Sequence, residues 1–142
     1  MNAADPATPM SWTPPPGPDA ELTEAGVWWD AVRVPGYLGD RVLERLGDAG
    51  GAVIRDPQAH RLHWLVTPGA ADGWRIPDVA GVHVLGAASW VSVPPAGRLC
   101  SAGPHWAVPV TAGCGLTDAD LLHRALAGVV AEALGPRAPL TR

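Results

Sequence analysis

Proline and glycine interrupt this chain so often that they restrict it to short elements. There are 16 Pro and 17 Gly among 142 residues. Pro lacks a backbone donor and breaks helices and sheet ladders, whereas Gly adopts the backbone conformations that tight turns need. We therefore expect short strands and helices joined by many turns. Because the chain has seven Trp and no Phe, Trp must provide most of the aromatic bulk of the core.

Two stretches have the apolar spacing of an amphipathic helix. The first covers residues 37–48 and is ended by the glycines that follow it. The second covers residues 117–134, with Thr117 as the expected N-cap and Asp120 where a capping box has Glu or Gln. The residues expected to form its buried face are Leu121, Leu122, Ala125, Leu126, Val129, Val130 and Ala133.

The first half of the chain also contains three stretches with the composition of strands. Residues 27–34 form the first, and residues 52–56 and 61–67 form a hairpin whose second strand alternates between apolar and polar positions. The side chains expected to face the helices are Leu62, Trp64 and Val66. Those expected on the opposite, open side are Arg61, His63 and Leu65.

The remaining strands lie in residues 81–109. The runs 82–85 and 89–93 flank a Gly-Ala-Ala turn, which predicts a second hairpin, and residues 105–107 should form one more edge strand. The order β-α-β-β-β-β-(β)-α predicts an α+β fold, with two helices packed on one face of a largely antiparallel sheet.

Residues 1–23 are Pro-rich and aperiodic, so we expect a disordered or draped arm ahead of a single domain at 24–142. Trp12 is the aromatic of this arm that could dock on the domain.

Charge and composition exclude several classes of protein. The formal net charge is −4, and no basic run provides the phosphate contacts of a dedicated nucleic-acid binder. The chain has no apolar run long enough to span a membrane, and its N-terminus lacks the pattern of a signal peptide. Two Cys without a CxxC motif predict no disulfide framework. We therefore expect a cytoplasmic protein without a membrane partner.

No motif predicts catalysis, a metal or a cofactor. Cys100, His105, Cys114 and His123 have metal-binding side chains, but their spacing matches no compact zinc motif. No Ser or Cys lies in a nucleophile pattern, and the glycines at 47–51 lack the Lys and Ser/Thr of a phosphate-binding loop. Several Trp residues could stack bases, although a place in the core is the stronger expectation.

The open sheet face carries the candidate ligand-binding residues. Arg61, His63 and His83 fall on strands that should be neighbours, and Arg33 in the first strand is the fourth candidate. An Arg beside two His favours an anion, more strongly as pH falls through the ordinary titration range of His at roughly 6 to 7. The alternative is a solvated face that binds nothing.

One resemblance extends over residues 27–134. The pieces that carry it are VWWDAVRVPG, GGAVIRDP, RLHWLVTPG, GVHVLG, ASWVSVPPAG and HWAVP. Together they resemble the primase–polymerase (prim-pol) domain of bifunctional DNA primase/polymerase proteins, in its divergent actinobacterial form. The resemblance implies an α+β fold like half of such a domain, which is RRM-like.

The chain departs from that family at the positions of its chemistry. The two acids of active members fall on Val32 and Val34, the third metal-binding acid on His83, and the nucleotide-binding His on Arg61. We expect these four residues to share the open face, which would then lack the carboxylates that two-metal phosphoryl transfer requires.

Three functions follow as hypotheses. The first is a catalytically inactive prim-pol-like domain that acts as a binding or regulatory module for a protein partner or a small anion. The second is a weak binder of single-stranded nucleic acid or nucleotides through the same sheet face, and the third is an enzyme of unrecognised chemistry. The oligomeric state stays open.

Overall fold

The computed structural model describes residues 12–111 and 115–135, and these form an α+β fold. A five-stranded antiparallel sheet has the strand order β5-β2-β4-β3-β7, and a separate two-stranded ribbon pairs β1 with β6. The strands are β1 (Glu21–Glu24), β2 (Asp30–Pro35), β3 (Val53–Asp56), β4 (Arg61–Val66), β5 (His83–Leu85), β6 (Trp90–Val93) and β7 (His105–Val108). The helices are α1 (Gly36–Leu46) and α2 (Ala119–Leu134), with short 3-10 turns at Gly47–Ala49 and Asp78–Ala80.

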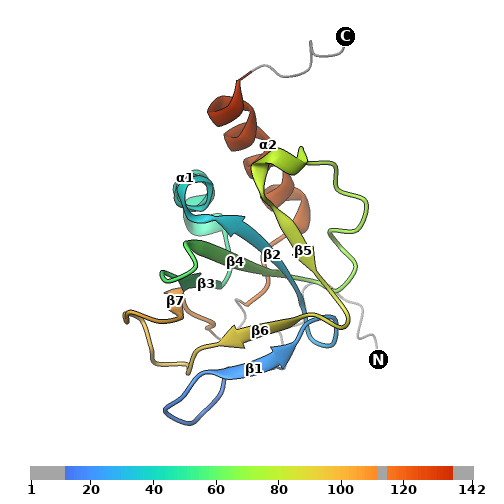
Figure 1. Ribbon diagram of the computed structural model, residues 1–142. Coiled ribbons are helices and arrows are strands. Elements are labelled where there is room, and N and C mark those ends of the chain that lie inside the picture. Colours follow the sequence, from blue (N-terminus) through green and yellow to red (C-terminus); the bar gives the residue numbers. More distant parts are fainter. Residues whose placement is uncertain (1–11, 112–114, 136–142) are drawn as a thin grey trace.

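Both helices pack on one face of the five-stranded sheet, as predicted (Figure 1). Leu62, Trp64 and Val66 of β4 are fully buried there against α1 and α2. The buried face of α2 consists of Leu122, Ala125, Leu126, Val129 and Val130. Leu121 and Ala133 were expected on that face but are exposed. The hairpin of β3 and β4 and the edge strand β7 are also confirmed.

The start of α2 differs from the prediction by one residue. Asp118 is the N-cap, and its Oδ1 accepts hydrogen bonds from the backbone N–H groups of Asp120 (2.9 Å) and Leu121 (3.1 Å). The Oγ1 of Thr117 is buried and accepts a hydrogen bond from the Gly51 N–H at 2.8 Å. Thr117 therefore links the helix start to the loop before β3, and Asp118 caps the helix instead.

The opposite face of the sheet is not open, because the β1–β6 ribbon covers part of it (Figure 1). A second core lies between them, with side chains from the ribbon, the sheet and the adjoining turns. Its buried members are Ala25, Trp29, Ala31, Ala52, Ile54, Leu65, Val91, Val93 and Trp106. Three of the seven Trp are fully buried on the two sides of the sheet: Trp29, Trp64 and Trp106. For these three, the core interpretation is the correct one.

The predicted second hairpin is wrong. β5 pairs with β2 in the large sheet, whereas β6 pairs with β1 in the ribbon. The turn between them is held by the β1–β2 connection, since the Ala25 N–H donates to the Ser89 carbonyl at 2.8 Å. At Gly26 (φ +92°) an added Cβ would lie 2.7 Å from the Ala87 nitrogen, so only glycine permits this approach. The chain turns as predicted, but its two strands separate into different sheets.

Residues 12–23, within the expected arm, pack along the domain, so this segment is draped rather than disordered. The Trp12 ring packs edge-on against Trp29, with the ring centroids 5.6 Å apart. Arg98 donates to the Pro18 carbonyl at 2.6 Å, and β1 begins at Glu21, inside the expected arm. Residues 1–11 lie outside the described residues.

The first strand of the large sheet starts only at Asp30, because Val27 and Trp28 form an exposed turn.

Within the described residues, no helix is long and apolar enough to cross a membrane.

Candidate functional site

The register of the large sheet brings the predicted binding residues together. Arg33 on β2 lies directly opposite His83 on β5 and His63 on β4. Directly opposite residues project to the same side of a sheet, so these three side chains form a row on the ribbon side. Arg61 lies two positions before His63 in β4 and projects to that side as well. We call Arg33, Arg61, His63 and His83 the basic corner.

The ribbon covers the other end of the same row. Beyond His63 the row continues through Ile54 on β3 to Trp106 on β7, and both are buried in the second core. At the basic corner Arg61 and His83 are exposed and Arg33 is half-buried. An open pocket of about 270 Å³ lies there, lined by Arg33, Pro35, Ala59, His60, Arg61, Gly81 and His83. His63 does not line this pocket and is only 8% exposed.

The expected position of Val32 and Val34 is wrong. Val32 lies opposite Trp64 and Val34 opposite Leu62, so both face the helices and are fully buried. Arg61 and His83 project to the other side of the sheet. The positions that the prim-pol resemblance equates with a metal site therefore do not share a face. A register shift of one residue exchanges the two faces of a strand, and the sequence alone does not determine that register.

His63 does not act as the expected cation. Burial, followed by the positive charges of Arg33 and Arg61, lowers the pKa of His63 from 6.5 to about 4, although Asp56 acts in the opposite direction. The ring is therefore neutral near pH 7. Its Nδ1 is buried and has no hydrogen-bond partner among the described residues. Of the two imidazoles expected to bind an anion, His83 is the one at the pocket.

The two arginines of the basic corner have no carboxylate within ion-pair distance among the described residues. By contrast, Arg41, Arg45 and Arg55 each form an ion pair at 3.1 Å or less. Burial and the neighbouring Arg61 lower the pKa of Arg33. The nearest carboxylate by register is Asp56, opposite Arg61, and its Oδ1 accepts the Ala59 N–H at 3.2 Å. The basic corner thus carries positive charge without a paired counter-ion.

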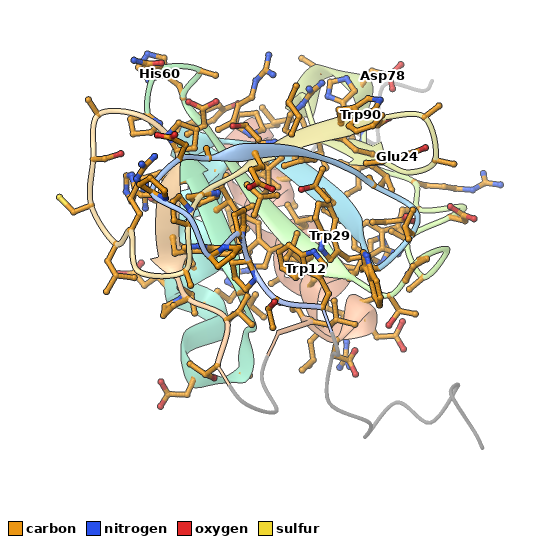
Figure 2. All side chains as sticks on the ribbon, turned by 90° about the horizontal axis from the view of Figure 1, so that it is seen from below. Trp12, Glu24, Trp29, His60, Asp78 and Trp90 are labelled. Atoms are coloured by element: carbon orange, nitrogen blue, oxygen red, sulfur yellow. The ribbon has the colours of Figure 1, made fainter. Side chains whose placement is uncertain are left out.

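His60 also lines the pocket at the basic corner, although it lies between the two predicted hairpin strands and is not among the predicted binding residues. It lies at the end of the β3–β4 turn with φ +57°, a backbone conformation that is unusual for a side chain with a Cβ. Its carbonyl accepts the Gly36 N–H at 2.7 Å, which joins the turn to the start of α1. In Figure 2, seen from the ribbon side, His60 lies at one edge of the molecule, away from the Trp12–Trp29 contact.

A second pocket adjoins the first around the start of α1. It encloses about 600 Å³ and is lined by Pro35, Gly36, Tyr37, Asp40, Arg55, Asp56, Pro57, His60, Arg61 and Leu62. The two pockets share Pro35, His60 and Arg61. The first turn of α1 contains no acidic residue, so the partial positive charge of this helix end is not offset there.

The expected metal-binding side chains do not gather in the described part of the chain. His123 on α2 stacks on Trp74, with the ring centroids 4.8 Å apart. The His105 ring contacts the Gly103 carbonyl, Cys100 is exposed, and Cys114 lies outside the described residues. Among residues 12–111 and 115–135, no three His, Cys, Asp or Glu side chains are arranged to hold a metal ion.

Comparison with known proteins gives no relative of this chain: no family model matches it, and neither a curated protein nor a solved structure shows significant similarity.

Proposed function

We propose that this chain is a non-catalytic binding module that holds a small anion at the basic corner. The observation that carries the proposal is the position of Arg33 and Arg61, diagonal neighbours on adjacent strands, at one open pocket, with no carboxylate in ion-pair distance among the described residues. Two like charges held close together repel each other and destabilise the fold. A bound anion would remove that repulsion.

The groups around the pocket suit an oxyanion. A guanidinium presents several N–H donors in a fixed plane and pairs well with phosphate or carboxylate oxygens. Arg33 and Arg61 can approach such a group from two strands, and His83 adds a ring nitrogen from a third. A volume of about 270 Å³ leaves room for a phosphate group and the atoms attached to it.

The proposal does not depend on the resemblance to prim-pol domains, which stays a prediction. If the chain descends from that family, its ligand site would lie on the face of Arg61 and His83. The family's two first-strand acids would then correspond to the buried Val32 and Val34. A site without these acids binds an anion through cations, not through divalent metal ions.

Calorimetric titration of the purified protein with inorganic phosphate tests the proposal. We expect saturable binding that Arg61→Ala weakens about tenfold, the usual effect of losing a charged hydrogen bond. Arg124→Ala is the matched control, because Arg124 is an exposed arginine on α2, on the other side of the sheet. Absence of saturable binding, or an equal loss in both variants, would refute the anion site.

A further inference from the structure

We infer that the ligand of the basic corner is a phosphorylated polyol, such as a sugar phosphate, whose hydroxyl-bearing body lies in the larger pocket beside Tyr37. The inference rests on the proposed function, because the anion held by Arg33 and Arg61 is its anchor. It adds the chemical class of the rest of the ligand.

The direction in which the ligand extends follows from the neighbours of the basic corner. A ligand cannot extend along the row toward β3 and β7, because the ribbon covers that part of the sheet. Ile54 and Trp106 are at most 1% exposed there. Toward the start of α1, the larger pocket adjoins the smaller one, and Pro35, His60 and Arg61 line both. A molecule anchored at Arg61 therefore has about 600 Å³ available for its body on that side.

The larger pocket offers hydrogen-bond acceptors. Asp40 uses Oδ1 to bind Arg55 at 2.8 Å, and Asp56 uses Oδ1 to accept the Ala59 N–H. Each carboxylate keeps a second oxygen without a hydrogen bond to the described residues. Ionised carboxylates only accept hydrogen bonds, so the ligand must carry donors at this place. Hydroxyl and ammonium groups are the two candidates.

The local charge favours hydroxyl groups over an ammonium group. Arg55 and Arg61 both line the larger pocket, and Arg55 already neutralises Asp40. An ammonium group in this pocket would share it with two guanidinium groups, and like charges repel. Neutral hydroxyls can donate to the same carboxylate oxygens without that repulsion. They can also accept hydrogen bonds from the two arginines.

Tyr37 supplies the surface on which a sugar ring or an extended polyol would lie. It is 59% exposed at the start of α1 and lines the larger pocket. Its ring is a flat apolar face with a polar hydroxyl at its end. The C–H groups of a polyol can pack on this face while its hydroxyls reach the carboxylates. A purely apolar body would leave Asp40 and Asp56 desolvated without partners, which is unfavourable.

Titration of the full chain with glucose 6-phosphate, inorganic phosphate and glucose tests the inference. We expect glucose 6-phosphate to bind at least about tenfold more tightly than phosphate, because its sugar adds contacts in the larger pocket, and glucose alone to show no saturable binding. Tyr37→Ala should weaken glucose 6-phosphate binding about fivefold and leave phosphate binding unchanged. Tyr37→Phe keeps the ring and should retain the affinity. Leu22→Ala removes another large exposed apolar side chain, on β1, and is the matched control.

The outcomes separate the two proposals. If phosphate itself does not bind, the proposed function fails. If phosphate binds but the sugar phosphate gains nothing, or if Tyr37→Ala weakens both ligands equally, the anion site stands and the polyol assignment is wrong. AMP also carries a phosphorylated sugar, ribose 5-phosphate, but with a base attached. Binding of AMP more than about tenfold tighter than glucose 6-phosphate would overturn the assignment, since a base would then supply the recognition.

Discussion

The two sides of the five-stranded sheet are covered in different ways. On the helix side, α1 and α2 seal a continuous core of aliphatic side chains around Trp64. On the ribbon side, two short strands cover only the apolar end of the sheet and leave Arg33, Arg61 and His83 at a pocket. The basic corner therefore stays accessible on the ribbon side of the sheet. The position of the candidate site on the sheet therefore depends on how much of each face the helices or the ribbon cover.

The largest expected effect comes from placing a charge on the sealed side. Val32→Asp introduces the acid that the resemblance to prim-pol domains would predict at this position, but it buries an unpaired carboxylate under the helices. We expect a loss of at least about 4 kcal/mol in the free energy of unfolding, measured by urea denaturation. His83→Asp, an exposed position of the same family pattern, should change it by less than about 1 kcal/mol. Equal tolerance of both changes would mean that the two faces are assigned the wrong way round.

The second prediction tests whether the ribbon side has a core of its own. Trp29 is fully buried between the ribbon and the sheet. Trp29→Ala should lower the free energy of unfolding by about 3–5 kcal/mol, as much as Trp64→Ala does on the helix side. Urea unfolding of the two variants gives the comparison. A loss below about 1 kcal/mol for Trp29→Ala alone would show that the ribbon does not contribute a stable core.

The third prediction concerns the acid sensitivity of the ribbon side. Since the pKa of His63 falls from 6.5 to about 4 on folding, the unfolded chain binds a proton between these values and the folded chain does not. The contribution to stability is therefore full above about pH 6.5, is lost as pH falls toward 4, and levels off below it, an effect of about 2–3 kcal/mol. Urea unfolding between pH 7 and pH 4 measures it. His63→Gln should remove this part of the slope; an unchanged slope would contradict the assignment.

The fourth prediction concerns the edge of the second core. Trp12 packs edge-on against Trp29, so Trp12→Ala should cost about 1–2 kcal/mol. Trp28 is 48% exposed and is the matched control, with an expected change below about 0.5 kcal/mol. If both variants melt at the same temperature, the segment from Trp12 to Glu21 does not belong to the folded domain.

The same contrast explains what the sequence could predict. The residues on the helix side of the sheet can be predicted from the sequence, because Leu62, Trp64 and Val66 lie at alternate positions of β4 and the helix patterns are long. The face that carries Arg61 and His63 can be predicted for a similar reason, since these two residues alternate with the apolar ones in β4. The side of the sheet on which Val32 and Val34 lie cannot be predicted in this way, because it depends on how β2 is paired in register with β4.

Features that depend on distant partners could not be predicted. The four residues of β1 follow a Pro-rich segment and form a strand only because β6 is there to pair with them. The turn at 86–88 was recognised, but a turn does not specify whether its two strands pair with each other. The low pKa of His63 and the place of His60 at the pocket likewise depend on groups that the fold brings from other strands.

If Arg33 and Arg61 lie together to bind an anion, their proximity should not itself stabilise the fold. The most direct measurement is the free energy of unfolding of the wild type and of Arg61→Ala, with and without inorganic phosphate at constant ionic strength. Without phosphate, Arg61→Ala should be at least as stable as the wild type, because the repulsion with Arg33 is gone. Phosphate at about ten times its dissociation constant should then stabilise the wild type by about 1.4 kcal/mol and the variant by much less. Equal stabilisation of both proteins, or of neither, would contradict the account.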